Sequence, residues 1–299
     1  MIFGDWGTTR LRLFRAGADG AAERLDGPGI GQLGGSPAEA LAETLAPWRA
    51  EARAGGLWLC GMAGSRNGLA EAPYVACPGG PEQWRAAAIT QELDGVPVTI
   101  APGLRAANLA GGPDVMRGEE TQIFGALRRE AALARGRHML VLPGTHSKWA
   151  ELVDGRIARF HSFMTGELFA LLRRHSMLAR AGEEGEEGRE EGFAAGLVRA
   201  AGAGALAGLF EARSAQLLDG RGREWALGFV SGLLIGGEIG DALRLAGEAP
   251  ESITLIGDPA LATLYARALE ASGRAAALFD GEVCALMGLR LLAEGGMTP

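Results

Sequence analysis

Short runs of alternating apolar and polar residues open the chain, and they predict strands. The segment from Met1 to Arg15 reads as two strands around a Gly-Thr-Thr turn, and a third strand is expected at 22–25. Helix and strand patterns then alternate, with a helix at about 36–54, a strand at 57–62, a helix at about 81–93 and a strand at 96–101. The predicted order is β-β-β-α-β-α-β.

The second part of the chain repeats this plan. An apolar strand at 138–142 leads into a second glycine turn, and strands at 149–153 and 157–163 flank an Asp-Gly hairpin turn. The later elements are expected at 253–256 (strand), 259–272 (helix), 276–279 (strand) and in a last helix that ends at about 294. Such a repeat of element order predicts two domains of similar architecture, although residue identity between the halves is slight.

The predicted fold class is therefore α/β, with two domains that are each a mixed sheet with helices on both faces. The N-terminal domain is expected to span 1–108 and the C-terminal domain 109–299, with a helical insertion at about 176–222. The last helix, about 281–294, is expected in the C-terminal domain, and packing on the N-terminal domain is the alternative. The acidic, glycine-rich run at 181–192 predicts a solvated loop, with a lid or a subunit contact as alternatives.

Composition narrows the classes of partner. The net charge of −7 over 299 residues argues against binding to nucleic acid. The longest apolar run, 226–239, is shorter than the roughly 20 residues that cross a bilayer, so we expect a buried helix and no membrane partner. We read no signal peptide after Met1, and three widely spaced cysteines indicate reduced thiols, which favours the cytoplasm. The oligomeric state stays open, with a homodimer as one alternative.

Two glycine turns carry the first candidate chemistry. Gly7-Thr8-Thr9 and Gly144-Thr145-His146-Ser147-Lys148 each present backbone N–H groups and hydroxyls, which suit phosphate oxygens. One such turn is compatible with an ordinary hairpin, but a matched pair favours a nucleotide held at its β- and γ-phosphates. Lys148 is the single lysine of the chain and adds a point charge. Asp5 precedes the first turn and offers a carboxylate to Mg²⁺.

A pair of carboxylates, Glu119 and Glu120, opens a predicted helix after Gly118. Phosphoryl transfer to an alcohol needs a group that accepts the hydroxyl proton, and a carboxylate near the attacking oxygen serves this purpose. The helix dipole also favours acidic residues in a first turn, so a purely structural role for the pair stays an alternative.

Several of these segments resemble the phosphate motifs of the actin-like (hexokinase/Hsp70/actin) kinases. GDWGTTRLR (4–12) resembles the first phosphate motif, LPGTHSKW (142–149) the second, and GEETQIFG (118–125) the helix start that bears the catalytic carboxylate. LIGDP (255–259) resembles the adenosine motif, with one glycine where the superfold has two. The resemblance implies two actin-like, ribonuclease H-like domains separated by a nucleotide cleft.

Four longer motifs resemble the 2-dehydro-3-deoxygalactonokinase family: GMAGSRNG (61–68), PDVMRGEETQIFGAL (113–127), LPGTHSKW and FMTGELFALL (163–172). This resemblance runs essentially from end to end. It implies ATP-dependent phosphorylation of the terminal (6-) hydroxyl of 2-dehydro-3-deoxy-D-galactonate in galactonate catabolism, with ATP and Mg²⁺ as cofactors and a sugar acid as the partner.

The resemblance also implies residue roles. Glu119 is the expected base, with Glu120 as the alternative, and Asp5 is expected to hold the metal. The residues expected to bind ATP and its phosphates are Gly7, Thr8, Thr9, Arg12, Gly144, Thr145, His146, Ser147, Lys148 and Gly257. The residues expected at the sugar acid are Ser65, Arg66, Asn67, Arg117, Thr165 and Glu167.

The sugar-acid residues each have a structural alternative. Arg66 suits bidentate binding of a carboxylate, and Ser65 and Asn67 suit hydroxyl or keto oxygens, but Asn-Gly is also a turn signal. Thr165 is equally explained as a helix cap. Two functional alternatives remain: another actin-like carbohydrate kinase, of the 2-keto-3-deoxygluconate, amino-sugar or glycerol type, and a non-catalytic nucleotide-binding module. A neutral sugar gives no reason for the guanidinium of Arg66.

Overall fold

The computed structural model describes residues 1–16, 22–179 and 187–294. The chain divides into two compact units. Unit 1 comprises 1–138, 150–160 and 279–299, and unit 2 comprises 139–149 and 161–278. This division differs from the predicted limit between residues 108 and 109, because the two units meet inside strands of the second sheet. The predicted limit itself stays a prediction.

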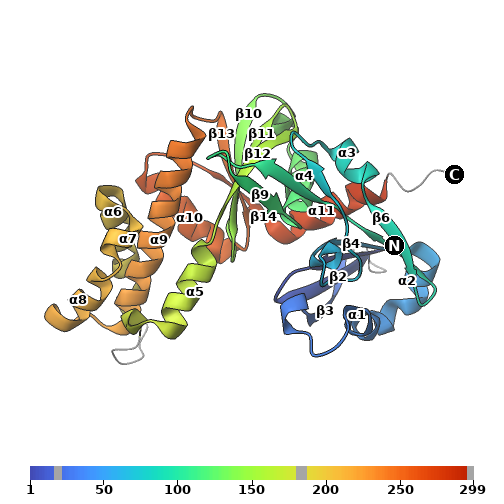
Figure 1. The fold of residues 1–299 in the computed structure, drawn as a ribbon, viewed down its shortest axis with the longest axis horizontal. Helices are drawn as coiled ribbons and strands as arrows, with labels where there is room; N and C mark the ends of the chain where they lie inside the picture. Colours follow the sequence, from blue (N-terminus) through green and yellow to red (C-terminus); the bar gives the residue numbers. More distant parts are fainter. Residues whose placement is uncertain (17–21, 180–186, 295–299) are drawn as a thin grey trace. The chain divides into compact units, whose positions relative to one another are not determined.

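A six-stranded sheet forms the base of unit 1 (Figure 1). Its strands follow the order β3-β2-β1-β4-β7-β6. Strand β1 pairs antiparallel with β2 and parallel with β4, and β7 continues the parallel part beside β4. The strand bounds are β1 (Ile2–Trp6), β2 (Arg10–Ala16), β3 (Ala22–Pro28), β4 (Leu57–Gly61), β6 (Ile89–Leu93) and β7 (Val96–Ile100).

The predicted helix at 81–93 is wrong in its second half. Helix α3 (Pro81–Ala86) ends early, and β6 and β7 form an antiparallel hairpin. Asp94 and Gly95 form its turn with φ values of 50° and 77°, the left-handed pair that a tight hairpin turn requires. The predicted helix at 36–54 is also divided, because Pro47 lies in a 3₁₀ turn between α1 (Pro37–Leu45) and α2 (Arg49–Gly55).

Unit 1 also contains a small sheet that the sequence pattern did not predict. It has the order β5-β8-β9, with β5 (Tyr74–Ala76), β8 (Gly103–Ala107) and β9 (Pro113–Met116). Strand β9 leads directly into α4 (Glu119–Arg129), whose main partner is α11 (Gly281–Ala293). The two helices touch by their backbones, since a Cβ on Gly125 would lie 1.8 Å from the Cys284 carbonyl oxygen. Helix α11 also packs on β1 and β4.

The second sheet has the order β12-β11-β10-β13-β14. In both sheets the first strand of the repeat lies between the second and the fourth, and the third strand lies at one edge. In the first sheet these strands are β1, β2, β4 and β3, and in the second they are β10, β11, β13 and β12. This shared order confirms the predicted fold class, an α/β plan that is repeated in two mixed sheets. The strand bounds are β10 (Arg137–Leu142), β11 (Ser147–Val153), β12 (Arg156–Phe163), β13 (Ser252–Gly257) and β14 (Ala277–Asp280).

The helices of unit 2 pack around α9, as Figure 1 shows. Helices α6 and α9 cross at four glycines, and a Cβ on any of them would lie 2.1 or 2.2 Å from a carbonyl oxygen of the facing helix. The glycines are Gly192, Gly196, Gly228 and Gly232. The helix bounds are α5 (Thr165–His175), α6 (Arg189–Ala203), α7 (Ala205–Gly208), α8 (Glu211–Leu218), α9 (Arg223–Ala246) and α10 (Pro259–Ala271).

Helices α6 to α8 occupy much of the predicted insertion at 176–222. Residues 181–186 of the predicted acidic loop lie outside the described residues. Its last residues are helical rather than loop, because α6 begins at Arg189. The short 3₁₀ helices of the chain are η1 (Ile30–Gln32), η2 (Ala46–Trp48), η3 (Met62–Gly64), η4 (Ala131–Ala134) and η5 (Met177–Ala179).

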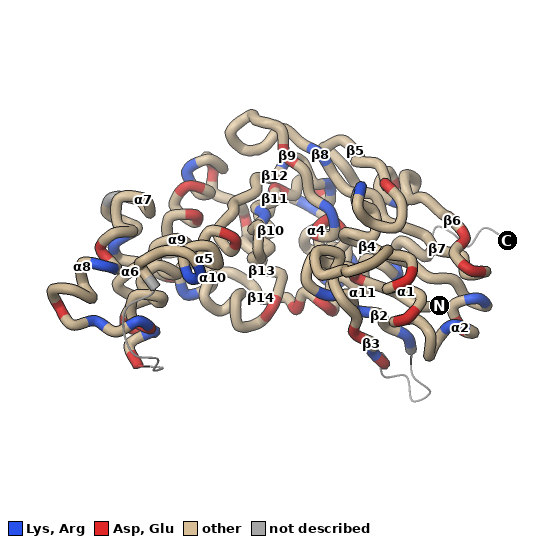
Figure 2. Tube along the Cα trace, turned by 60° about the horizontal axis from the view of Figure 1, so that its bottom comes forward, with Lys and Arg blue, Asp and Glu red and all other residues tan. Residues whose placement is uncertain are grey.

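Helix α9 contains the long apolar run and is mostly buried, as predicted. Among the described residues, α9 alone is long and apolar enough to cross a membrane by length and composition. Because 67% of its most apolar window is buried inside the protein, core packing accounts for its composition. At the surface, basic and acidic residues are interspersed along unit 1 (Figure 2), for example in the Arg24–Asp26 and Arg49–Asp94 pairs.

Candidate functional site

The first glycine turn joins β1 to β2 in unit 1. The Gly7 N–H donates to the Arg10 carbonyl at 2.8 Å, which leaves Thr8 and Thr9 exposed at the tip. The turn is supported from behind by the backbone, since the Gly31 N–H donates to the Thr8 carbonyl at 2.9 Å. A Cβ on Gly29 would lie 2.3 Å from that same oxygen. The turn therefore has a fixed backbone and two exposed hydroxyls.

Asp5 and Arg12 face each other across the β1–β2 ladder beside this turn. Arg12 Nη2 donates to Asp5 Oδ2 at 2.5 Å, and Arg12 Nη1 lies 3.5 Å from Glu282 Oε2. The other oxygen of Asp5 accepts the Cys60 thiol at 3.7 Å. Asp5 is buried. In this structure the carboxylate predicted to hold the metal is paired with the Arg12 guanidinium.

The two glutamates at the start of α4 have different surroundings. Glu120 is fully buried; its oxygens accept the Gly118 N–H at 2.7 Å and the Thr121 hydroxyl at 3.0 Å. Burial, with a further contribution from the Glu119 charge, raises the pKa of Glu120 to about 7. Glu119 is partly exposed and accepts the Arg117 N–H at 3.0 Å. Gly118 makes the bend possible, with φ +108°.

These carboxylates converge on one end of the unit 1 sheet. Burial raises the pKa of the Cys60 thiol well above its usual value, and the charges of Asp5 and Glu120 raise it further. At the end of β4, Cβ atoms placed on Gly61 and Gly118 would lie 3.5 Å from Asp5 Oδ1 and 3.1 Å from the Gly61 Cα, respectively. The fold thus gathers Asp5, Glu120 and the start of α4 around the end of β4.

The turn after β4 contains the predicted sugar-acid residues. Ser65 donates from its hydroxyl to the Met62 carbonyl at 2.8 Å, while Arg66 and Asn67 are exposed. The Arg66 side chain is 85% exposed and lies 3.5 Å from Glu71, so it has the freedom to move to a ligand. The prediction that these residues lie on a loop after β4 is therefore confirmed. The carboxylates gather at the end of the same strand.

Arg117, which follows β9, packs against the same loop. It donates to the Ala72 carbonyl at 2.7 Å and stacks over the Tyr74 ring at 4.2 Å. Its Nη1 is buried and, among the described residues, has no hydrogen-bond partner. A Cβ on Gly64 would lie 2.7 Å from this atom, so the guanidinium meets the loop 62–68 directly. A buried donor of this kind suits an anionic ligand.

The second glycine turn is held in unit 2 by the start of α5. The Glu167 N–H donates to the Thr145 carbonyl at 2.9 Å, and a Cβ on Gly166 would lie 2.3 Å from the Gly144 carbonyl oxygen. His146 Nε2 lies 2.5 Å from Glu167 Oε2. Thr145 and His146 are exposed, whereas Gly144 is half-buried. Two residues predicted at different ligands, His146 and Glu167, therefore contact each other.

Ser147 and Lys148 do not lie at the surface of this turn. Ser147 is fully buried, and its hydroxyl donates to Glu238 Oε2 at 3.1 Å and lies 2.8 Å from the Tyr265 hydroxyl. Lys148 is also buried and donates to Ser162 Oγ at 2.6 Å. Since Ser147 begins β11, the two side chains point to opposite faces of the sheet. Ser147 thus supports the turn from the interior of unit 2, whereas Lys148 contacts the neighbouring strand β12.

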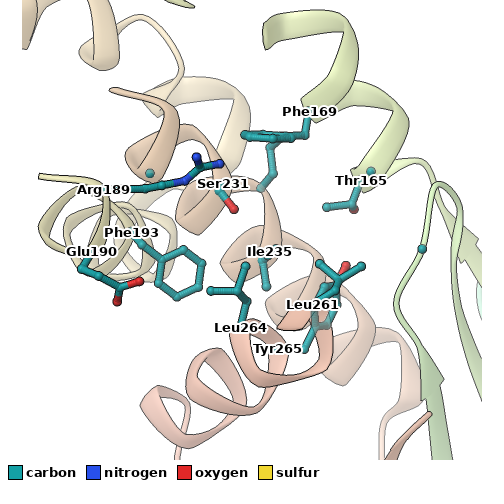
Figure 3. A pocket seen from close by; sticks show the side chains of 14 residues that line it. Thr165, Phe169, Arg189, Glu190, Phe193, Ser231, Ile235, Leu261, Leu264 and Tyr265 are labelled. Carbon is teal, nitrogen blue, oxygen red and sulfur yellow. The ribbon is translucent and has the colours of Figure 1, made fainter. Parts of the chain in front are cut away.

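A mostly apolar pocket of about 160 Å³ adjoins the second turn within unit 2. Figure 3 shows aromatic and aliphatic side chains from α5, α6, α9 and α10 around it. Gly257 is not among the lining residues. It ends β13, near Pro143, and Asp258 caps α10 through the Ala260 and Leu261 N–H groups. The lining residues include Gly144, Thr165, Gly166, Phe169, Arg189, Phe193, Ser231, Ile235, Leu261, Leu264 and Tyr265.

Comparison with known proteins assigns this arrangement to a family. The family model described as 2-keto-3-deoxy-galactonokinase matches residues 5–292. The chain belongs to this family. The match confirms the resemblance drawn from the four motifs, and the matched residues include both glycine turns, the carboxylate cluster and the residues that line the pocket.

Relatives within the family cover nearly the whole chain. A 2-dehydro-3-deoxygalactonokinase of Escherichia coli (strain K12) is 36% identical over 295 residues, which is 97% of this chain and 96% of that protein. A Rhizobium meliloti (strain 1021) protein, provisionally assigned the same activity, is 39% identical over 97% of this chain and 95% of its own length. A solved Sinorhizobium meliloti structure with that provisional assignment matches with a TM-score of 0.82 at 33% identity, covering 100% of this chain and 99% of the other.

Sequence reasoning missed the residues beneath the second turn. Glu238 and Tyr265 bind Ser147 from helices that are 91 and 118 residues away along the chain. One signal was present, because Glu238 is a carboxylate within the apolar run at 226–239 that predicted a buried helix. A buried carboxylate needs hydrogen-bond partners, but the sequence pattern does not say which residues supply them.

Proposed function

We propose that this chain is an ATP-dependent 2-dehydro-3-deoxygalactonokinase, which phosphorylates the 6-hydroxyl of 2-dehydro-3-deoxy-D-galactonate. The observation that carries the proposal is the family match over residues 5–292, together with a relative of that name that is 36% identical over 97% of the chain. The alternatives of another actin-like carbohydrate kinase and of a non-catalytic nucleotide-binding module are not favoured by these relatives.

In this proposal unit 2 binds the nucleoside side of ATP. The pocket beside the second turn is mostly apolar, which suits the faces of an adenine ring. Its edge is formed by Gly144 and Gly166, where the turn and the start of α5 meet. The exposed backbone and side chains of Gly144, Thr145 and His146 would bind phosphate oxygens, with Gly257 near the adenosine and Ser147 and Lys148 acting from beneath.

The first turn would bind phosphate through Gly7, Thr8 and Thr9. Arg12 would leave Asp5 for a phosphate oxygen, which frees the carboxylate for Mg²⁺. A single carboxylate fits this ion when it arrives with the nucleotide, because phosphates and water supply most of its ligands. Such an ion would neutralise charge on the transferred phosphoryl group. Among the described residues no cluster of three His, Cys, Asp or Glu side chains is arranged for a metal, in keeping with a site completed by ATP.

We assign the base to Glu119 and keep Glu120 as the alternative. Glu119 is the more accessible of the two, and a base must reach the substrate hydroxyl within hydrogen-bond distance. The pKa of Glu120, about 7, is well matched to proton transfer, but its oxygens are enclosed by Gly118 and Thr121. A Glu120 base would therefore require the α4 start to open when the sugar acid binds.

The sugar-acid carboxylate is assigned to the arginines near the loop 62–68. Arg66 is exposed and mobile enough to close on a ligand, and Arg117 has a buried donor without a partner among the described residues. Ser65 and Asn67 would read the keto and hydroxyl oxygens. Thr165 and Glu167 remain proposed substrate residues, although in this structure Glu167 contacts His146 and Thr165 lines the apolar pocket.

Measurement of ADP release tests the proposed function. The assay compares wild-type protein with ATP alone, with 2-dehydro-3-deoxy-D-galactonate, with the gluconate epimer and with N-acetylglucosamine or glycerol. Release that depends on the galactonate derivative supports the proposal. ATP hydrolysis that no acceptor changes, or faster phosphorylation of a neutral sugar, overturns it.

The cellular setting and assembly are proposed on separate grounds. The free cysteines Cys60, Cys77 and Cys284 are compatible with the reducing cytoplasm. Helices α6 to α8 expose several large apolar side chains that favour burial against protein, and a second copy of this chain, giving a homodimer, is the partner we propose. These side chains are Val198, Leu206, Phe210, Leu217 and Leu218. Light scattering that gives the monomer mass at micromolar concentration would exclude the dimer.

A further inference from the structure

Glu238 lies in the interior of unit 2, where a carboxylate is costly. It is 4% exposed and occupies the middle of α9, and it is the one charged residue among the buried residues of that helix. Among the described residues, no Lys, Arg or His side chain forms an ion pair with it. Burial therefore raises its pKa, while its hydrogen-bond donors oppose that shift. An apolar residue would pack here without these costs, so the carboxylate calls for an explanation.

Its partners come from three elements: β11, α5 and α10. Oε1 accepts the Trp149 indole N–H at 2.7 Å. Oε2 accepts the Tyr265 hydroxyl at 2.7 Å and the Ser147 hydroxyl at 3.1 Å, and the Thr165 hydroxyl also acts to lower the pKa of the carboxyl. These four neutral donors replace the cation that a buried carboxylate usually has. Only an acceptor with two oxygens satisfies donors on both of its sides.

These donors belong to the parts that form the proposed nucleotide half-site. Ser147 belongs to the second glycine turn and begins β11. Thr165 is the first residue of α5, whose backbone is locked against that turn. Tyr265 and Thr165 both line the apolar pocket beside it, as Figure 3 shows. Trp149 lies on the same face of β11 as Ser147. One side chain thus connects the turn, the start of α5 and a wall of the pocket.

We infer that Glu238 is a positioning residue for the nucleotide, which fixes the second glycine turn relative to the pocket through Ser147, Thr165 and Tyr265. The inference rests on the proposed function, since it names a support for the ATP half-site. Glu238 does not contact the nucleotide. It sets the distance between the group that binds phosphate and the walls that hold the base, and such preorganisation contributes to affinity for a ligand that spans both.

Replacement of Glu238 by Gln tests the inference. Gln keeps the shape but has one acceptor oxygen, so donors on one side of the side chain lose their partner. Loss of one hydrogen bond to a charged group corresponds to about a tenfold change. We expect Glu238→Gln to raise the KM for ATP about tenfold and to leave the KM for the sugar acid within about twofold. Equal changes in both KM values, or none in a folded variant, overturn the inference.

Glu151→Gln is a matched control. Glu151 is also buried, and it lies on β11, the strand that contains Ser147 and Trp149. Its partners are Arg137 and Arg159 in unit 1, and it has no place in the proposed site. It reports what the loss of a buried carboxylate does to stability alone. We expect Glu151→Gln to lower the melting temperature without changing the KM for ATP. If both variants raise this KM equally, the effect is structural and the inference fails.

Ser147→Ala decides whether Glu238 acts through the turn, and it also serves if Glu238→Gln does not fold. We expect this variant to raise the KM for ATP severalfold, and the double variant to be no worse than the more severe single one, because both changes break the same link. An unchanged KM in folded Ser147→Ala overturns the inference. If wild-type protein shows no acceptor-dependent ADP release, the kinase proposal has failed, and calorimetric ATP affinities of these variants then test the inference separately.

Discussion

The two glycine turns occupy equivalent places in two sheets of the same order, yet they are supported in different ways. The first is held by backbone contacts from residues 29–31, and its neighbouring carboxylate, Asp5, is paired with Arg12. The second is held by backbone contacts from the start of α5 and, in addition, by side chains, with Ser147 bound to Glu238 and Tyr265 in the interior. The repeat of architecture therefore does not extend to the polar groups beneath each turn, and each half-site has its own sensitivity to substitution.

Buried carboxylates make the difference clear. Glu151 has two guanidinium partners: burial raises its pKa, but hydrogen bonds from Arg159 and Arg137 outweigh this and lower it. The pKa values of Glu120 and Glu238 are raised because burial dominates where only neutral donors are present. Of these three carboxylates, the two without a cation lie at the two half-sites, and Glu151, which has two cations, lies outside them. Asp5, paired with Arg12, is a further buried carboxylate of the unit 1 site. Perturbed carboxylates cluster at functional sites more often than elsewhere, which supports the assignment of both regions.

The largest expected effect separates chemistry from nucleotide binding. Glu119→Gln removes the proposed base from unit 1, and we expect turnover to fall by roughly 10²-fold or more, while affinity for ATP stays near the wild-type value. Steady-state kinetics and calorimetric ATP titration measure the two quantities. Glu120→Gln is the matched variant on the neighbouring residue. If Glu120→Gln is the more damaging and Glu119→Gln retains near-normal turnover, the two roles must be exchanged.

A second prediction uses the raised pKa of Glu120. In the folded protein this pKa is about 7, compared with an ordinary value of 4.5, so between these pH values the native state holds a proton that the unfolded chain has released. The contribution of Glu120 to stability therefore falls as pH rises from about 4.5 to about 7 and is constant above that. The shift corresponds to a loss of the order of 3 kcal/mol.

Urea unfolding of wild-type protein and Glu120→Gln across pH 4.5 to 8 measures this contribution as a difference between two curves. Other titrating groups affect both proteins and cancel. Parallel curves would mean that Glu120 is ionised throughout, and its burial would then need a cation at the unit 1 site. A wild-type curve that falls relative to the Glu120→Gln curve as pH rises supports a carboxylate that is neutral in mildly acidic solution.

Much of the fold followed from the sequence because alternation and turn residues act locally. The β-β-β unit at each turn was readable from apolar alternation and glycine turns, and the repeat of element order predicted two domains of similar architecture. The β6–β7 hairpin was missed because the 81–93 segment was read as one helix, although Asp94-Gly95 is a strong hairpin signal. Strands β5, β8 and β9 are three to five residues long and partly exposed, so they leave a weak pattern.

The candidate site was predictable only in part. Asp5, Gly118 and the glutamates were found from motifs, and the fold gathers Asp5 and Glu120 around Cys60. The orientation of Ser147 and Lys148 was not predicted, because the motif suggested that both side chains face phosphate. The pleated strand that begins at Ser147 directs them to opposite faces of the sheet. The partners of Glu238 depend on tertiary packing between β11, α5, α9 and α10, which no local pattern encodes.

The smallest expected effect concerns Lys148, whose ammonium is buried and donates to Ser162. If this charge supports phosphate binding from beneath the second turn, Lys148→Ala should raise the KM for ATP about tenfold, as expected for losing one charge-assisted contact, and leave the KM for the sugar acid nearly unchanged. Ser162→Ala is the control, because it removes the partner and keeps the charge. A larger loss with Ser162→Ala, or an effect of Lys148→Ala confined to the sugar acid, would show that Lys148 supports something other than nucleotide binding, and the second turn would then depend on the Glu238 network alone.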